Sequence, residues 1–448
     1  MIKRLIAVMI VFLCTCIPAF AAPSLPQTIR IGLYFEKSAV SSIPLTFTNG
    51  FEAGVWQDEK LAVQFTYAQP CVVKASKSTA NANEIVLINE KGETIFTFPN
   101  GDIGLDLMPI AGADGKRDVT IDKVTYHGGV ELKRLTNSDM TVINRVPFEQ
   151  YLYNVVPYEL SASYPIEALK AQAIAARTYA ARNINRYKKF GFDMDATTNC
   201  QVYFGTKGEH VNSNLAVDST KGQVLTYEGK LIEALFFASD GGYTEDSVNV
   251  WGGVYPYFKA TRDPYETADI ASKYEYNVEM TAQKVGELMQ SKGYDLGDIL
   301  SVQAEQYSPS GRVIKLTVQG TKDKKTVERE GARTLLGLHS QKYKIITDAI
   351  TQLFIVQASG QAVAMQKPQT VHVMTADGVA QTNGQLCVQS ENGVSALNTG
   401  GIPTVYRFVG NGYGHAIGMS QIGAVGMAKQ GFTYDKILQF YYQGVTIE

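Results

Sequence analysis

Residues 157–182 read PYELSASYPIEALKAQAIAARTYAAR, and this stretch decides how the centre of the chain folds. Its small and apolar residues recur at steps of three and four, which is the spacing of one helix face: Ile166, Leu169, Ala173, Ala176, Ala180 and, just beyond, Ile184. Pro165 stands at a favoured first helical position, and Ser163 is a candidate cap. The sequence therefore predicts a helix over residues 165–188.

The sequence before this helix has a different pattern. From residue 28 to about residue 134, short apolar runs such as 29–34 and 84–88 alternate with Gly, Asn and Asp residues that are typical of turns. This pattern indicates β-strands and hairpins, and we assign residues 22–135 to a β-rich N-terminal lobe.

The sequence after the helix falls into three parts. Gly and Tyr are frequent up to residue 269, which predicts long ordered loops, with strands expected at 222–227 and 231–238. Residues 270–405 are more polar, with a helix expected at 282–290 and strands at 313–318 and 370–374. Residues 406–448 are again rich in Gly and aromatic residues, with a short amphipathic helix expected at 436–442.

We therefore expect an α+β protein with a β-rich N-terminal lobe and a mixed catalytic core. The core would consist of residues 136–269 and be completed by residues 406–448, with residues 270–405 as an inserted accessory lobe. A chain of 448 residues, 45% hydrophobic and 19% charged, is long enough to bury more than one core. Its formal net charge of −2 disfavours nucleic acid as a partner, because nucleic acid binding calls for a basic surface.

The first residues have the pattern of a secretory signal peptide. Lys3 and Arg4 precede an apolar run over 5–17, and small residues close the segment at 19–21. We expect residues 1–21 to direct the chain out of the cytoplasm, to the cell envelope or the medium. If the segment stays uncleaved, it would anchor the chain to the membrane, although a spanning helix needs about 20 residues. Cleavage would leave 39 basic and 43 acidic residues, a formal charge of −4.

The cysteines do not form a disulfide pattern. Cys14 and Cys16 lie inside the predicted signal, which leaves an odd trio of Cys71, Cys200 and Cys387. Cys200 and His210 are two candidate metal ligands, too few for a zinc site. We predict no catalytic metal and no cofactor, and a structural zinc stays open as an alternative.

Three blocks of sequence carry the functional signal. The first joins PYEL at 157–160 to PIEALKAQA at 165–173 and AARTYA at 175–180. The second is SDGGYTE at 239–245 with PY at 256–257 and DPY at 263–265, and the third is GYGHAIGMSQ at 412–421. In this order the blocks closely resemble the signature of the SpoIID/LytB family, the stage II sporulation protein D-like proteins. The sequence differs from the family at Asn154 and Ala416, where Gly is usual, and at Leu160, where Met is common.

The resemblance implies a peptidoglycan lytic transglycosylase. Such an enzyme cleaves the bond between N-acetylmuramic acid and N-acetylglucosamine in glycan strands and leaves 1,6-anhydro ends. Resemblance to the sporulation enzyme also implies strands that lack stem peptides, with an N-acetylmuramoyl-L-alanine amidase as a functional partner. Two alternatives stay open: a non-catalytic wall-binding protein that enhances an amidase, as LytB-like relatives do, and an envelope structural protein with a degenerate site.

By resemblance, Glu159 occupies the position of the family's catalytic acid. Its neighbours Tyr158 and Leu160 would partly desolvate the carboxyl group, which raises its pKa toward the range of a general acid. Most glycosidases need a second carboxylate. A lytic transglycosylase does not, because the six-hydroxyl of the muramic sugar attacks the anomeric carbon. The alternative is that Glu159 only precedes a helix and stabilises its start.

Further residues are predicted to bind the glycan, from family position and helical spacing. Gln172 and Tyr179 share one helix face, and Lys170 and Arg177 share another, although Arg177 equally suits a buried anchor for carbonyl groups or a carboxylate. A serine hydrolase is disfavoured because Ser239 lacks the Gly-x-Ser-x-Gly elbow. For His415 a purely structural imidazole is the alternative. The predicted substrate-binding residues are Lys170, Gln172, Arg177, Tyr179, Gln201, Ser239, Gly241, Gly242, Thr244, His415, Ser420 and Gln421.

Overall fold

The structure is a computed structural model of the whole chain. It describes residues 23–81, 83–135, 139–349 and 401–448, together with the backbone of short strands between residues 353 and 396. The predicted signal peptide, residues 1–21, lies outside the described residues. Within the described part, no helix is both long enough and apolar enough to cross a membrane.

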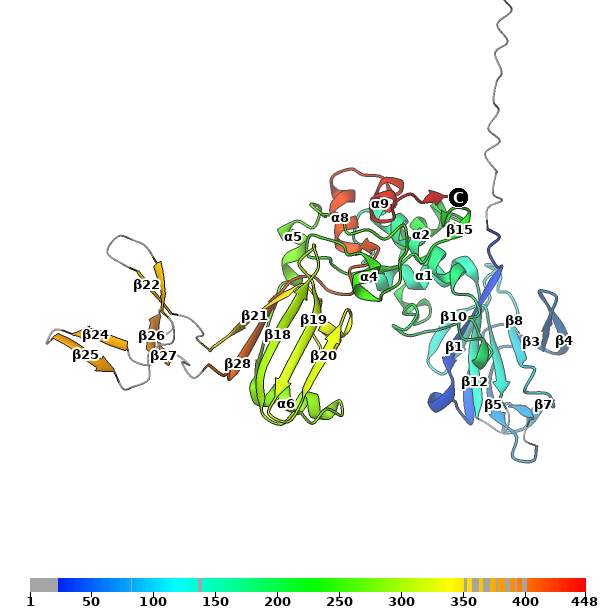
Figure 1. Cartoon of the computed structure of the whole chain (residues 1–448). Coiled ribbons are helices and arrows are strands. Elements are labelled where there is room, and N and C mark those ends of the chain that lie inside the picture. Colours follow the sequence, from blue (N-terminus) through cyan, green and yellow to red (C-terminus); the bar gives the residue numbers. More distant parts are fainter. Residues whose placement is uncertain are drawn as a thin grey trace, which may run out of the picture.

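The N-terminal part is built from two antiparallel sheets that share one hydrophobic core (Figure 1). The seven-stranded sheet has the order β13 (Met194–Asp195), β1 (Thr28–Tyr34), β12 (Met140–Pro147), β11 (Gly129–Arg134), β8 (Leu105–Pro109), β3 (Phe51–Gln57) and β4 (Lys60–Tyr67). Only β13 pairs in parallel, beside β1. The six-stranded sheet has the order β10 (Val124–His127), β9 (Asp118–Ile121), β2 (Ser42–Phe47), β5 (Cys71–Lys77), β6 (Ile85–Ile88) and β7 (Thr94–Phe98). The short helix η1 (Glu36–Ser38) follows β1.

Strand β12 leads directly into helix α1 (Phe148–Glu159), which the sequence analysis did not predict. Pro157 lies inside its last turn, and Glu159 is its final residue. Helix α2 (Ile166–Arg182) was predicted, but it ends at Arg182 instead of residue 188. Its N-cap is Pro165, and the predicted cap Ser163 bonds instead to Ser161, with 3.0 Å between the hydroxyl oxygens. Glu159 thus ends one helix and does not stabilise the start of the next.

Helix α2 is buried on more than one side, which explains its alanines. Ala168, Leu169, Ala173 and Ala176 belong to the core shared with the two sheets. Ala171, Ile174 and Ala175 belong to a second core. Small side chains on both faces allow neighbouring elements to approach the helix closely, and a helix that is apolar all round is typically buried.

The second core joins residues far apart in sequence. Helices α8 (Gln421–Lys429) and α9 (Tyr434–Tyr441) contact α2, and β29 (Met419–Ser420) pairs in parallel with β16 (Phe236–Phe237). The C-terminal segment therefore packs against the same helix that follows Glu159. The remaining elements here are η2 (Lys188–Phe190), η3 (Thr206–Gly208), α3 (Val211–Ser219), β14 (Leu225–Tyr227), β15 (Lys230–Leu231), α4 (Ser247–Val250), α5 (Ala268–Ala271), η4 (Ser272–Tyr274) and β30 (Thr446–Ile447).

Residues from Tyr276 to Gly410 contribute a separate lobe with its own core (Figure 1). One sheet has the order β17 (Tyr276–Thr281), β28 (Val405–Gly410) and β21 (Tyr343–Thr347), and the other has β18 (Ile299–Tyr307), β19 (Val313–Gly320) and β20 (Lys324–Glu328). Helices α6 (Ala282–Ser291) and α7 (Gly331–Thr334) complete it. Strand β28 crosses the predicted boundary at residue 405. Beyond this sheet lie three hairpins, β22 (Leu353–Val356) with β23 (Ala362–Met365), β24 (Val371–Thr375) with β25 (Gly378–Thr382), and β26 (Cys387–Ser390) with β27 (Gly393–Ala396).

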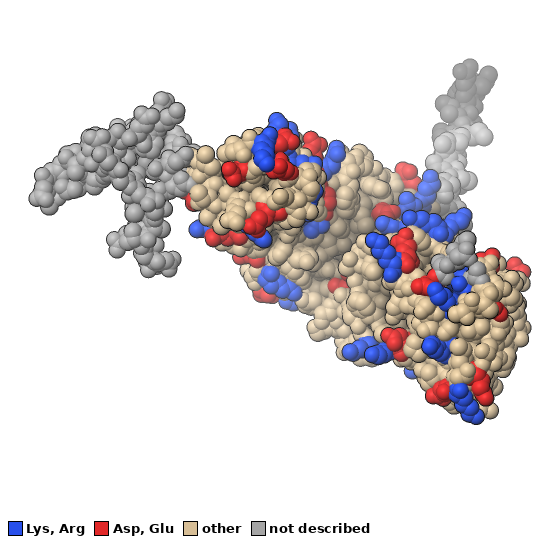
Figure 2. All heavy atoms as spheres, turned by 90° about the horizontal axis from the view of Figure 1, so that it is seen from below, with Lys and Arg blue, Asp and Glu red and all other residues tan. Residues whose placement is uncertain are grey.

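The predicted α+β class is confirmed by this mixture of helices and several sheets. On the face shown in Figure 2, basic and acidic side chains are interspersed, and no continuous basic stripe is visible. That distribution agrees with the near-neutral net charge of −2.

A histidine links the N-terminal sheets to the loop after η3. His127 Nδ1 lies 2.6 Å from Asp118 Oδ1 in the neighbouring strand, and its Nε2 lies 2.8 Å from Glu209 Oε1. Burial lowers the pKa of His127, but hydrogen bonds to Glu209 and Asp118 and their negative charges outweigh burial and raise it above 6.5. The protonated imidazole therefore bridges two carboxylates from different parts of the chain.

This bridge predicts a pH dependence of stability. A group whose pKa is raised on folding stabilises the folded state fully below its unfolded pKa, here about 6.5, and the contribution is lost as the pH rises through the folded value. We expect the midpoint of urea unfolding to fall over that range, and His127→Gln to reduce the pH dependence. An unchanged pH profile in His127→Gln would show that this bridge does not contribute.

Candidate active site

A cleft of about 640 Å³ opens beside the end of α1. Its lining comes from α1, α2, the loops that follow them and the C-terminal segment. The lining residues are Glu159, Tyr179, Arg186, Thr198, Asn199, Cys200, Gln201, Val202, Glu233, Leu235, Phe236, Trp251, Gly253, Tyr255 and His415. Four predicted site residues, Glu159, Tyr179, Gln201 and His415, thus line one cavity.

Glu159 is held at the cleft by groups from two other parts of the chain. Gln421 Nε2, at the start of α8, lies 3.5 Å from Glu159 Oε2 and 3.4 Å from Gln172 Oε1 on α2. Burial raises the pKa of Glu159 above its usual value, while hydrogen bonds from Gln421 and the backbone of Val202 partly offset that rise. A raised pKa keeps more of the carboxyl group protonated, which is the form that a general acid requires.

Gln201 and Tyr179 lie on the cleft wall with defined contacts. Gln201 Oε1 accepts a hydrogen bond from Tyr151 at 3.2 Å, and its Nε2 donates to the carbonyl of Ala176 at 3.4 Å. The Tyr179 hydroxyl accepts a hydrogen bond of 3.0 Å from Arg186 Nη1. Burial raises the pKa of Tyr179, so the phenol keeps its proton.

Asn154, where the family usually has Gly, helps to shape this wall. It is buried, and its Oδ1 accepts a hydrogen bond of 2.8 Å from the backbone N–H of Phe204. The side chain therefore ties α1 to the loop that carries Gln201.

His415 reaches the cleft from the C-terminal segment. Its Nδ1 accepts a hydrogen bond of 3.1 Å from the backbone of Ile417, and its ring lies 5.2 Å from that of Phe237 and 5.0 Å from that of Trp251. Burial lowers the pKa of His415 to about 3, with a smaller contribution from the charge of Arg333. The imidazole is therefore neutral near pH 7 and does not carry a charge into the cleft.

Ala416, beside it, has a φ of +65°, in the left-handed region that favours glycine. This backbone geometry accounts for the family's usual Gly at that position. The carbonyl of Ala416 accepts a hydrogen bond of 2.8 Å from the backbone of Glu245, which connects the His415 and Ser239 blocks.

None of the predicted binding residues of the Ser239 block lines the cleft: Ser239 and Thr244 are buried, and Gly241 and Gly242 are half-buried. Glu266 accepts four hydrogen bonds there, from the hydroxyl groups of Ser239 and Ser420 and from the backbone N–H groups of Asp240 and Gly241. Thr244 is also buried, and its hydroxyl donates to the carbonyl of Lys259 at 2.9 Å. The hydroxyl groups of Ser239 and Thr244 therefore have hydrogen-bond partners within the protein.

The two glycines of this block allow the backbone to form the turn. Gly241 and Gly242 have φ values of +64° and +96°, and a Cβ on Gly241 would lie 2.8 Å from Asn411 Oδ1. Backbone N–H groups thereby face the carboxylates of Glu266 and Asp240.

Lys170 and Arg177 also lie away from the cleft lining. Lys170 pairs with Glu167 at 2.7 Å. Arg177 is fully buried, binds the carboxylate of Glu149 at 2.8 Å and donates to the carbonyl groups of Val217 and Gln223. The second interpretation of Arg177, as a structural anchor, fits this geometry.

Among the cleft residues that the sequence analysis did not single out, three bring a charge or a large aromatic face. Glu233 is a second carboxylate, bonded to Arg182 Nε at 3.1 Å and to Asn183 Nδ2 at 3.4 Å. Arg186 adds a positive charge, and Trp251 an aromatic face that is 42% exposed. Trp251 is one of only two tryptophans in the chain, and this rarity was the one feature of the sequence that could have drawn attention to it.

The inserted lobe contacts the loop that carries Trp251. The backbone N–H of Glu330 donates to the carbonyl of Val250 at 3.1 Å, and Arg329 Nε donates to the carbonyl of Val248 at 3.2 Å. The lobe therefore supports one wall of the cleft. A separate hollow of about 670 Å³ within the lobe, beside Tyr276 and Lys342, contains none of the predicted site residues.

One cluster of carboxylates in the described part of the chain has the spacing of metal ligands. Asp240, Asp263 and Glu266 bring one carboxylate oxygen each within 4.8 Å of one another. Because Glu266 already accepts four hydrogen bonds, it acts as an anchor for the Ser239 turn. Burial raises the pKa of the Cys200 thiol to about 11.

Comparisons with known proteins identify relatives of this chain. A family model described as stage II sporulation protein (SpoIID) matches residues 136–227. The amidase enhancer of Bacillus subtilis is 31% identical over 306 residues, which cover 66% of this chain but only 40% of that protein. The stage II sporulation protein D of Bacillus amyloliquefaciens is 30% identical over 325 residues, covering 68% of this chain and 75% of that protein. The stage II sporulation protein D of Bacillus subtilis is 29% identical over 321 residues, again covering 68% of this chain and 75% of that protein.

Proposed function

The chain belongs to the stage II sporulation protein D family, and on that premise we propose that it is an exported lytic transglycosylase acting on peptidoglycan glycan strands. The observation that carries the proposal is the position of Glu159, a partly desolvated carboxyl group in a cleft completed by the C-terminal segment. Family membership supports a role related to the cell wall, and the N-terminal signal pattern supports export.

The proposed reaction needs one carboxyl group. Glu159 gives its proton to the oxygen that joins N-acetylmuramic acid to N-acetylglucosamine, and the bond from that oxygen to C1 of the muramic sugar breaks. The carboxylate then takes the proton of the six-hydroxyl of the same sugar, whose oxygen bonds to C1. The products are a 1,6-anhydro end and a free four-hydroxyl on the leaving sugar, and Glu159 is protonated again.

Glu233 supports a second candidate, ordinary glycoside hydrolysis. A hydrolase uses two carboxyl groups, one as acid and one as base or nucleophile. Glu233 lines the same cleft as Glu159, but its carboxylate is held by Arg182 and Asn183. We therefore favour the mechanism that uses Glu159 alone.

The products distinguish these candidates and the amidase-enhancer alternative. We expect purified protein, given glycan strands without stem peptides, to release fragments with anhydro-muramic ends, which mass spectrometry detects as one water lighter than hydrolysed fragments. Reducing muramic ends would indicate hydrolysis. An amidase accelerated by a protein that itself releases no fragments would indicate an enhancer, the function in the name of the Bacillus subtilis relative.

A further inference from the structure

Arg186 is the one residue with a permanent positive charge among the described side chains that line the cleft. It follows the end of α2, and its side chain is exposed to solvent. His415, the other basic residue of the lining, is neutral near pH 7. A negatively charged group on a bound ligand would therefore find its counter-charge at Arg186.

The guanidinium group is oriented on one side and open on the other. Nη1 donates to the Tyr179 hydroxyl at 3.0 Å and to Asn183 Oδ1 at 3.2 Å. In the described part of the chain, the side-chain hydrogen bonds of Arg186 use only this nitrogen. The edge formed by Nε and Nη2 is thus left for a ligand, and two parallel N–H groups on that edge match the geometry of a carboxylate.

The nearby acidic residue of the cleft already has partners. Glu233 accepts hydrogen bonds from Arg182 Nε and Asn183 Nδ2. The Tyr179 hydroxyl, which accepts from Arg186, keeps its own proton available to donate. A carboxylate bound at the free edge of Arg186 would consequently meet two guanidinium donors without displacing an ion pair.

We propose that Arg186, held in place by Tyr179, binds the lactyl carboxylate of N-acetylmuramic acid and so selects strands that lack stem peptides. This inference rests on the proposed function, because it places the glycan in the Glu159 cleft. In a strand without stem peptides the lactyl group ends in a free carboxylate. In a strand with stem peptides the same group is an uncharged amide, which offers no charged partner to a guanidinium.

The test compares two glycans that differ in this group. Binding is measured by calorimetry in a Glu159→Gln background, which prevents turnover, with denuded glycan strands and with chitin oligosaccharides of equal length, which have no lactyl group. Arg186→Gln should weaken binding of denuded strands by about 10- to 100-fold, the range for losing a charge-assisted bidentate contact, and leave chitin binding within about twofold. Arg186→Lys should recover only part of the loss, because it keeps the charge but not the fork.

A neighbouring lysine provides the matched control. Lys188 lies two residues further on, at the start of η2 and outside the cleft lining, so Lys188→Gln removes an equal charge and should change binding of neither glycan. Equal effects of Arg186→Gln on both glycans, or no effect on either, would overturn the inference while leaving the proposed function intact. If the Glu159→Gln protein binds neither glycan, the proposed function fails, and the inference fails with it.

Discussion

Replacement of Glu159 by Gln is expected to lower the rate of glycan cleavage about 100-fold or more, the usual loss when general acid catalysis is removed. The amide has nearly the same shape, so contacts with Gln421 and the backbone of Val202 can persist, but it cannot give its proton to the leaving oxygen. The rate is measured as release of anhydro ends from denuded strands. Circular dichroism and strand binding should match the unchanged protein.

Glu233→Gln is the matched control, because it neutralises the other carboxylate in the cleft lining. We expect it to keep most of the activity. If Glu159→Gln keeps more than about a tenth of the rate, Glu159 is not the general acid. If both variants are inactive and the unchanged protein gives reducing ends, the cleft is that of a hydrolase that uses both residues.

The periodicity of α2 was readable from the sequence, whereas the helix before it was not. Val155, Val156 and Pro157 have low helix propensity and read as an extended segment. In the structure Val155 and Val156 are fully buried, so packing outweighs their propensity and α1 continues to Glu159. The consequence for the site is direct, since the end of this helix presents Glu159 to the cleft.

The candidate site was predicted best where residues belong to the recognised sequence blocks. Glu159 and His415 line one cleft although the inserted lobe separates them in sequence. The Ser239 block was interpreted as sugar-binding because polar residues among glycines suit that role. Its donors bond instead to Glu266, a partner that spacing along the chain does not reveal. Arg186 belongs to no motif, and only the folded chain brings it to the cleft.

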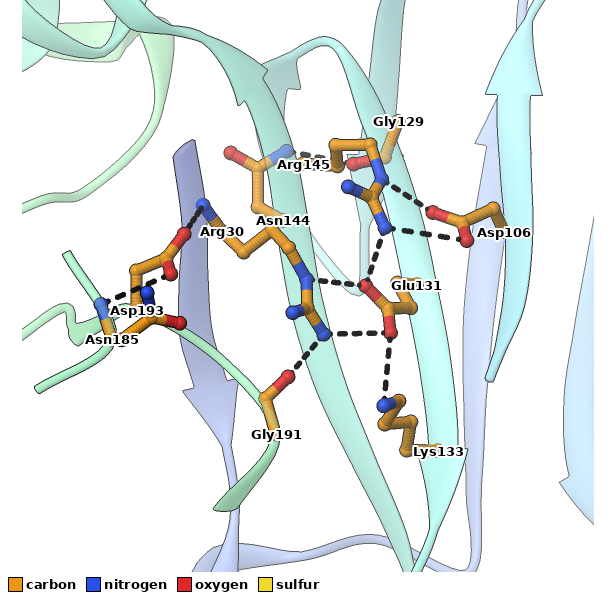
Figure 3. Close-up of polar contacts among 10 residues, drawn as sticks. All are labelled: Arg30, Asp106, Gly129, Glu131, Lys133, Asn144, Arg145, Asn185, Gly191 and Asp193. Carbon is orange, nitrogen blue, oxygen red and sulfur yellow. Dashed lines mark hydrogen bonds and ion pairs between the residues drawn. The ribbon is translucent and has the colours of Figure 1, made fainter. Parts of the chain in front are cut away.

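Glu131→Ala is expected to reduce the free energy of unfolding by about 3–5 kcal/mol, because it removes a buried carboxylate that two arginines share. Glu131 is 2% exposed and bonds to Arg30 and to Arg145, each at 2.8 Å, while Arg145 also bonds to Asp106 at 2.6 Å (Figure 3). These residues lie on the adjacent strands β1, β12, β11 and β8. Denaturant unfolding measures the loss.

Glu279→Ala provides a control with the same chemical change on an exposed ion pair. Its partner Arg407 lies 2.9 Å away, but both side chains are more than half exposed, so the loss should stay within about 1 kcal/mol. A Glu131→Ala loss equally small would show that the four-strand network is not stabilising.

The same network contacts the segment that precedes the loop carrying Gln201. The Arg30 side chain donates to the carbonyl of Gly191, and the Arg30 backbone N–H donates to the carboxylate of Asp193. Loosening this network should therefore make glycan cleavage more sensitive to denaturant, with the rate in its absence largely retained.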